Sequence, residues 1–248
     1  MTRVVSERSG RLADIAGILF DKDGTLIRYD ESWEPVNREA ARIAAAGRVE
    51  LEPRLLAAAG MEPDTGLTRP DSLLAAGNAA EIAAGFVAAG SPLDLAELTA
   101  LLDALFVTAT GYAVPVTDLP VLFSALKARG LKLGIASSDN ELAIRRTAER
   151  FGICGHLDFV AGYDSGFGPK PEPGMVLGFC AATGLDPRQV AIVGDNSHDL
   201  RMGENAGVGL RIGVLTGTGS RDTLAAMADF CLDDIAALAV MLREIAPV

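Results

Sequence analysis

Two aspartates separated by one residue follow the first apolar segment of the chain. Asp21 and Asp23 come directly after the run GILF (residues 17–20), and Gly24 and Thr25 complete the motif. The run predicts a buried strand whose carboxyl end presents both carboxylates. Gly24 allows a turn with open backbone amides, and Thr25 adds a hydroxyl. An isolated surface turn could share this sequence, but the preceding strand favours a site for a divalent cation and an anionic ligand.

Three further segments carry polar side chains just after predicted strands. They contain Ser137, Lys170, and the pair Asp195 and Asp199, the second of which falls in the first turn of a predicted helix. In an open α/β sheet, ligands bind at the carboxyl ends of the strands. We therefore expect these side chains to lie near Asp21.

The residue types in these segments are suited to reactions of phosphate esters. A carboxylate can attack phosphorus, and a second one nearby can move protons. Lys170 stands between two prolines and offers a point charge for a phosphate, while Asp195 and Asp199 can hold an oxygen-seeking cation such as Mg²⁺. Two structural alternatives remain: Ser137 as a helix cap, in competition with its neighbours Ser138 and Asp139, and Asp199 as a favourable charge at a helix N-terminus.

The rest of the chain predicts two kinds of structure. Residues 30–113 are expected to be helical throughout, which is typical of a helical subdomain inserted into a loop; the expected helices are one capped by Ser32 and those at 52–59, 71–89 and 94–108. From residue 115, strands alternate with helices, which predicts an α/β fold with a parallel sheet covered on both faces. The expected strands are 131–136, 159–161, 190–193 and 209–214, and the expected helices are 119–129, 140–150, 174–183, one ending at 206, 221–228 and 234–244.

Composition limits the function classes. The chain has 248 residues, 49% of them hydrophobic, and a formal net charge of −11, which argues against nucleic-acid binding. Its three cysteines, Cys154, Cys180 and Cys231, are too far apart for a disulfide framework and are expected to be buried and inert. The N-terminal residues Arg3, Glu7, Arg8 and Arg11 lack the apolar core of a signal peptide, and no run approaches the ~18 apolar residues of a spanning helix. We expect a soluble cytoplasmic protein with no membrane partner.

The four motifs together resemble those of the haloacid dehalogenase (HAD) superfamily, in the phosphoglycolate phosphatase and β-phosphoglucomutase-like group. The resemblance covers nearly the whole chain and agrees in the order, spacing and strand context of the motifs. It implies a Rossmann-like α/β catalytic core made of residues 1–28 and 114–248. Residues 29–113 correspond to a helical cap inserted between the first two motifs.

The resemblance also implies a role for each motif residue. Asp21 is the nucleophile that forms an aspartyl-phosphate, and Asp23 is the general acid and base. The implied Mg²⁺ ligands are Asp21, the Asp23 backbone carbonyl, Asp195 and, directly or through water, Asp199. The implied phosphate-binding groups are Ser137, Lys170 and the amides of Gly24 and Thr25.

Several residues lie near these motifs without an assigned role in the chemistry. Ser138 and Asn196 are candidates for supporting the phosphate and metal positions. We expect a local packing or hydrogen-bonding role for His198 rather than metal ligation, and core packing or helix entry for Trp33. The chain also departs from many relatives at Arg28-Tyr29 and at Ser138-Asp139, which concerns the substrate more than the chemistry. The stretch GTGS (residues 217–220) is interpreted as a turn.

The leading hypothesis is a Mg²⁺-dependent phosphatase that acts on a small phosphorylated metabolite as a monomer or a homodimer. A phosphomutase of the same fold is the alternative, since it would use the same residues to move phosphate within one sugar. A phospho-acceptor signalling module of the receiver type is an alternative of another class. Such modules have about half this length and no helical insert, and their acceptor aspartate does not end the first strand.

Overall fold

A six-stranded parallel sheet forms the centre of the structure, a computed structural model that describes residues 12–243. The strand order is β3-β2-β1-β4-β5-β6, and every neighbouring pair is parallel. The strands are β1 (Gly17–Phe20), β2 (Lys132–Ala136), β3 (Phe159–Ala161), β4 (Val190–Gly194), β5 (Leu210–Val214) and β6 (Phe230–Leu232). The parallel α/β fold predicted from the alternating pattern is confirmed.

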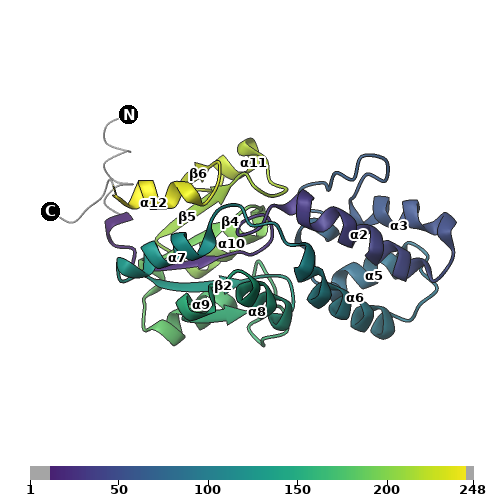
Figure 1. Cartoon of the computed structure of the whole chain (residues 1–248), viewed down its shortest axis with the longest axis horizontal. Coiled ribbons are helices and arrows are strands. Elements are labelled where there is room, and N and C mark those ends of the chain that lie inside the picture. Colours follow the sequence, from purple (N-terminus) through teal and green to yellow (C-terminus); the bar gives the residue numbers. More distant parts are fainter. Residues whose placement is uncertain (1–11, 244–248) are drawn as a thin grey trace.

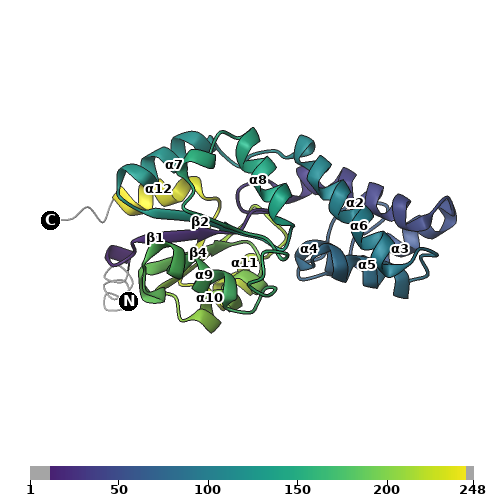
Figure 2. The same cartoon turned by 90° about the horizontal axis from the view of Figure 1, so that it is seen from below.

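Helices cover both faces of this sheet because side chains alternate along each strand. From β1, Ile18 and Phe20 enter an apolar cluster that also holds Phe123, whereas Leu19 enters a second cluster with Phe179. Figure 2 shows α7 and α12 on one side of the sheet and α9 and α10 on the other. The covering helices are α7 (Leu119–Ala128), α8 (Glu141–Arg150), α9 (Gly174–Thr183), α10 (Ser197–Ala206), α11 (Arg221–Ala225) and α12 (Ala236–Arg243).

The remaining helices pack on one another beside the sheet and are called here the helical lobe (Figure 1). They surround an apolar cluster of their own, in which Leu55, Phe86 and Leu102 are fully buried. The helices of the lobe are α2 (Tyr29–Ala45), α3 (Glu52–Ala59), α4 (Leu73–Ala76), α5 (Ala79–Ala88) and α6 (Leu95–Ala109). A separate core allows the lobe to keep its shape if it moves relative to the sheet.

The chain passes between the sheet and the lobe twice, and the two passages are hydrogen-bonded to each other. The Arg28 amide donates to the Val114 carbonyl at 2.9 Å, and the Val116 amide donates to the Leu26 carbonyl at 3.0 Å. These bonds bring the start of the lobe beside its end, directly after the motif that contains Asp21 and Asp23.

Three details of the predicted elements were wrong. Ser32 does not cap a helix, because α2 already begins at Tyr29 and the Ser32 hydroxyl accepts the Val114 amide instead. The single helix expected over residues 71–89 is broken at Gly77, after which Asn78 starts α5 with a capping box. Strand β6 was missed, since three residues carry no periodicity that separates a strand from a helix.

Two further expectations need correction, one about the burial of the cysteines and one about long apolar segments. Of the three cysteines expected to be buried, only Cys180 is; Cys231 is half-buried, and Cys154 is exposed in a short 3₁₀ turn before β3. The segment Leu95–Tyr112 is long and apolar enough to cross a membrane, with a mean hydropathy of 1.2. Its Leu98, Leu102 and Phe106 lie in the core of the helical lobe, and one such helix is weak evidence for a span.

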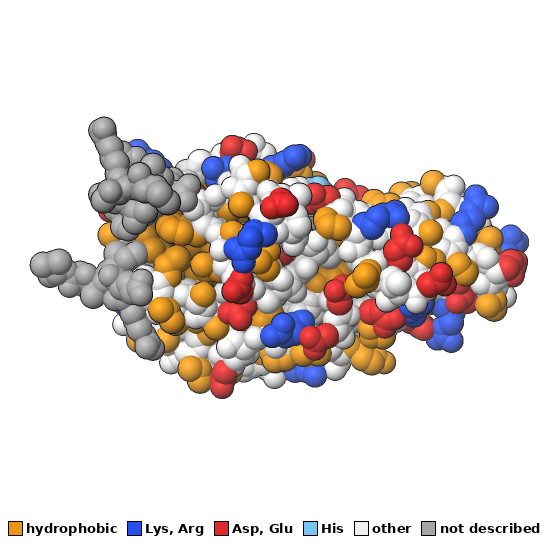
Figure 3. Space-filling view, turned by 90° about the horizontal axis from the view of Figure 1, so that it is seen from above, with side chains coloured by type: hydrophobic (Ala, Val, Ile, Leu, Met, Phe, Trp, Pro, Cys, Tyr) orange, Lys and Arg blue, Asp and Glu red, His pale blue; other side chains and the backbone are white. Residues whose placement is uncertain are grey.

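The visible surface carries charges of both signs. Figure 3 shows acidic and basic side chains interspersed over one face, without a broad basic area on that face. The N-terminal charged residues named in the sequence analysis lie outside the described residues; they are Arg3, Glu7, Arg8 and Arg11. Glu244, the expected end of the last helix, also lies outside them.

Candidate active site

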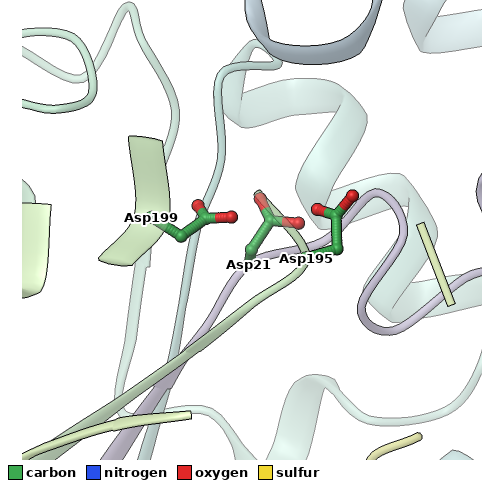
Figure 4. Close-up of side chains that lie close together, drawn as sticks. All are labelled: Asp21, Asp195 and Asp199. Atoms are coloured by element: carbon green, nitrogen blue, oxygen red, sulfur yellow. The ribbon is translucent and has the colours of Figure 1, made fainter. Parts of the chain in front are cut away.

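Three buried carboxylates meet at the carboxyl edge of the sheet. Asp21 follows β1, Asp195 follows β4, and Asp199 lies in the first turn of α10. Each offers an oxygen, and these oxygens all lie within 4.8 Å of one another. Figure 4 shows the Asp21 carboxylate between the other two. The strand ends therefore bring together three of the residues that the sequence predicted for this site.

Lys170 is the cation of this cluster. Its Nζ lies 2.6 Å from Asp21 Oδ1 and 2.6 Å from Asp199 Oδ1, and all three side chains are buried. Burial alone would lower the pKa of Lys170, but the two carboxylates raise it, so the ammonium keeps its charge.

Burial acts in the opposite sense on the carboxylates. It raises the pKa of Asp21 to about 7, with Lys170 opposing the shift and Asp199 adding to it. Burial also raises the pKa of Asp195, and the nearby Asp21 and Asp199 add to that effect. A positive charge bound at the cluster would favour the ionised forms of Asp21 and Asp195.

The backbone around Asp21 and Asp195 holds both side chains in place. The Asp21 amide donates to the Val193 carbonyl at 2.8 Å, which extends the pairing of β1 and β4 by one residue. Gly24 has φ +80°, and a Cβ there would lie 2.6 Å from Asp195 Oδ2, so this turn requires glycine. The Thr218 amide donates to the same Oδ2 at 2.8 Å. The GTGS turn thus supports Asp195, a role that its sequence did not reveal.

Asp23 lies apart from the three carboxylates and is held by two donors. Lys22 Nζ contacts Asp23 Oδ1 at 2.7 Å, and the Trp33 indole N–H donates to the same oxygen at 2.6 Å. Lys22 is 2% exposed and also pairs with Asp139 Oδ2 at 3.0 Å. Although burial would lower the pKa of Lys22, the two carboxylates raise it.

Sequence reasoning missed Lys22 and Asp139. The clue for Lys22 was that β1 is apolar on both faces, so a residue that continues its alternation past Ile18 and Phe20 is expected to be covered. A buried lysine needs a carboxylate partner, but nothing local in the sequence identified Asp139. Trp33 was expected to pack in the core, and it does stack on Tyr29 and meet Phe106 edge-on, yet its N–H also contacts Asp23.

The other predicted residues are placed as follows. Ser137, Ser138 and Asn196 line a cavity at the junction of sheet and lobe, together with Asp21 and Lys170. The Ser137 hydroxyl accepts the Asp139 amide at 3.1 Å, which leaves its proton free to donate. It does not cap α8, because Asn140 does.

The amides of Gly24 and Thr25 differ from expectation. They donate within their own turn, to the carbonyls of Ile27 (2.8 Å) and Lys22 (3.4 Å). A phosphate-binding role for these two amides is not supported by this structure.

Asn196 and His198 lie at the start of α10. The Asn196 side chain caps the helix by accepting the amides of His198 (2.9 Å) and Asp199 (3.4 Å), and its Nδ2 lies 3.5 Å from Asp195 Oδ1. His198 is outside the carboxylate cluster. Arg28 is half-buried, and its Nε lies 3.7 Å from Glu31 Oε1, a partner on its own helix.

The carboxylate cluster has the donor set of a hard divalent cation. Its ligand atoms are all oxygens, which such cations prefer. Asp21 Oδ2 is buried and has no hydrogen-bond partner among the described residues. A buried polar atom without a partner is costly, and a cation between the carboxylates would satisfy it. The residues therefore fit a metal ion held by Asp21, Asp195 and Asp199.

Comparison with known proteins identifies the family of this chain. A family model described as haloacid dehalogenase-like hydrolase matches residues 15–207, most of the chain. The phosphoglycolate phosphatase of Aquifex aeolicus is 31% identical over 96 residues, which cover 39% of this chain and 45% of that protein. Alignments with a probable phosphatase of Dickeya dadantii and with two proteins described as a pyrophosphatase and a putative pyrophosphatase likewise span about half of those proteins. The N-acetylmuramic acid 6-phosphate phosphatase of Pseudomonas aeruginosa is 25% identical over 78% of this chain and 79% of its own.

Solved structures share the fold over nearly the whole chain. A crystal structure described as a predicted phosphoglycolate phosphatase from Haemophilus somnus superposes with a TM-score of 0.70 at 19% identity, covering 92% of this chain and 98% of its own. Identity at this level shows the fold alone. The family match over residues 15–207 shows the family as well. The motif residues Asp21, Lys170 and Asp195 all lie within the matched range. This chain belongs to the haloacid dehalogenase-like hydrolases.

Proposed function

We propose that this protein is a Mg²⁺-dependent phosphomonoester hydrolase of the phosphoglycolate phosphatase-like group, which acts on a small phosphorylated metabolite. The observation that supports this most strongly is the placement of Asp21. Its carboxylate lies between two other buried carboxylates and 2.6 Å from Lys170. Positioning and charge neutralisation are the main requirements of phosphoryl transfer.

In the first step, an Asp21 carboxylate oxygen attacks phosphorus and the bond from phosphorus to the ester oxygen breaks. The Asp23 carboxyl gives its proton to the departing oxygen, so an alcohol leaves and an aspartyl-phosphate remains. Lys22 and Trp33 both contact Asp23 Oδ1, and none of the described residues donates to Oδ2. Oδ2 is therefore the oxygen proposed to carry the proton.

In the second step, water attacks the phosphorus of the aspartyl-phosphate. Asp23, now a carboxylate, accepts a proton from that water, and the bond from phosphorus to Asp21 breaks to release inorganic phosphate. Lys170 and the Ser137 hydroxyl bind the phosphoryl oxygens in both steps. When bound at Asp21, Asp195 and Asp199, Mg²⁺ would offset the repulsion between the anionic carboxylate and the anionic phosphate.

The helical lobe, residues 29–113, is proposed to act as a cap on a core made of residues 1–28 and 114–248. It contributes Trp33, Leu74 and Phe106 to the cavity wall. Closure of such an element excludes bulk water from the reaction.

The test is phosphate release from a panel of phosphate esters, with and without Mg²⁺. We expect Asp21→Asn to lower kcat by at least ~10³-fold, because the nucleophile is removed. Asp14→Asn is the matched control, since Asp14 is exposed, and it should leave activity unchanged. Full activity of Asp21→Asn would contradict the assignment.

A further inference from the structure

The cavity at the active site has two chemically different walls. The wall from the sheet is polar and contains Asp21, Asp23, Asp139 and Lys170. The wall from the helical lobe is mainly apolar and is formed by Trp33, Leu74, Ala75, Ala76, Ile82 and Phe106. If phosphorus is bound beside Asp21, the group that leaves with the ester oxygen must face the second wall.

Two hydrogen-bond donors on the lobe side of the cavity are already engaged. The Tyr29 hydroxyl donates to the Leu74 carbonyl and receives the Asn37 side-chain amide at 3.5 Å. The Trp33 N–H donates to Asp23 at 2.6 Å. These contacts engage the Tyr29 and Trp33 donors, so the lobe offers a ligand mainly methyl groups and aromatic rings, with the neutral Asn37 carboxamide as a further polar group.

The charges around the cavity disfavour a second anionic group. Lys170 is the one lysine or arginine among the described residues that line the cavity, and it pairs with Asp21 and Asp199. Lys22, behind the wall, pairs with Asp23 and Asp139. A carboxylate or a second phosphate on the leaving group would therefore be desolvated beside Asp23 and Asp139 without a counter-charge, which is costly in a partly buried site.

We propose that the substrate is a phosphate monoester of an uncharged, mainly apolar alcohol or phenol, small enough for this cavity. The inference rests on the proposed phosphatase function and narrows it. Esters whose leaving group carries a carboxylate or another phosphate, including 2-phosphoglycolate, are therefore expected to be poor substrates. The cap wall formed by Leu74, Ala75 and Ile82 is then a specificity determinant.

The test compares pairs of esters that differ in charge more than in size. Phosphate release by the full chain with Mg²⁺ is measured for propyl phosphate against 2-phosphoglycolate, and for phenyl phosphate against 4-carboxyphenyl phosphate. We expect kcat/KM to be at least ~100-fold higher for the uncharged member of each pair, in keeping with the cost of an unpaired buried charge. Calorimetric titration of Asp21→Asn with propyl phosphate and 2-phosphoglycolate should show the same order of affinity.

A positive charge placed in the cap wall tests whether this wall sets the preference for uncharged esters. Ala75 lines the cavity and is half-buried, so Ala75→Lys should reduce the preference for the uncharged esters at least tenfold. Ala58→Lys is the matched control, because Ala58 is exposed on α3 and does not line the cavity, and it should leave the preference unchanged.

The possible outcomes separate this inference from the function on which it rests. Equal or better hydrolysis of the charged esters, or an unchanged preference in Ala75→Lys, overturns the inference and leaves the phosphatase intact. No release from these four esters, with release from other esters of the wider panel, also overturns it. No release from any ester of the panel overturns the proposed function and this inference with it.

Discussion

Lys22 lies between two aspartates in the sequence, and its position there does not reveal its role in orienting Asp23. It is buried and lies 2.7 Å from Asp23 and 3.0 Å from Asp139, and its ammonium also lies 5.3 Å from the centre of the Trp33 ring. These contacts fix the orientation of the proposed acid and base. Lys22 is thus a positioning residue that does not line the cavity itself.

Replacing Lys22 by methionine should destabilise the protein and impair the reaction. Lys22→Met leaves the buried Asp139 and the half-buried Asp23 without their cation, which should lower the free energy of unfolding by about 3 kcal/mol. Urea unfolding measures this loss. Lys132→Met is the control, since Lys132 is half-exposed and lies 3.4 Å from its partner Asp158, and should cost less than about 1 kcal/mol. Similar losses in the two variants would contradict a special role for the buried pair.

At the scale of elements, Asp103 and Asp71 join the helical lobe to the sheet. Asp103 on α6 accepts the Tyr163 hydroxyl at 2.9 Å and lies 3.3 Å from Asn140 Nδ2. Asp71, in the lobe, accepts the Ser197 hydroxyl at 2.9 Å. Both contacts join the lobe to residues that neighbour Asp139 and Asn196 of the cavity, so they favour the present position of the lobe.

Asp103→Ala should shift the lobe toward more open arrangements without unfolding it, because its apolar core does not include Asp103. We expect a larger radius of gyration in small-angle X-ray scattering and faster proteolysis of the passages near Arg28 and Val114. Asp94→Ala removes another α6 aspartate, one that only caps the helix, and serves as the control. Identical scattering curves for Asp103→Ala and the unaltered protein would show that these bonds do not hold the lobe.

Asp158 joins α7 to β2 and makes stability depend on pH. Burial would raise the pKa of Asp158, but hydrogen bonds from Lys127 (2.7 Å) and the Leu133 amide (2.9 Å) outweigh it and hold the pKa below its ordinary value. A carboxylate whose pKa is lowered by folding stabilises the folded state above its unfolded pKa and loses that effect as pH falls.

Asp158→Asn should therefore reduce the free energy of unfolding by about 1 kcal/mol at pH 7. The difference from the unaltered protein should shrink below about pH 4. Denaturant unfolding at a series of pH values measures it, and a difference that is independent of pH would contradict the ionic role of Asp158.

At the scale of the whole molecule, the sheet and its active edge were predictable because their signals are local. An apolar run that ends in Asp21 or Asp195 identifies both a buried strand and the residue at its carboxyl end. The parallel topology then brings these ends together. The helical lobe was predictable for the same reason, since the spacing of apolar residues in α6 needs no knowledge of the rest of the chain.

The features that were missed depend on contacts between distant parts of the chain. Lys22 pairs with Asp139, and Thr218 supports Asp195, over separations that no local pattern reports. Ser32 was misread as a helix cap because its partner, the Val114 amide, lies 82 residues away. The apolar lobe wall of the cavity likewise arises only when α2, α4, α5 and α6 are packed together.

The central claim is that Asp21 carries the phosphoryl group, and chemical trapping tests it most directly. The protein is mixed with a hydrolysable ester and Mg²⁺, quenched in acid and reduced with borohydride, which converts an aspartyl-phosphate to homoserine. Peptide mass spectrometry should find homoserine at position 21, and none without ester or in Asp21→Asn. Phosphate release without modification at position 21, or modification at another aspartate instead, would contradict the account.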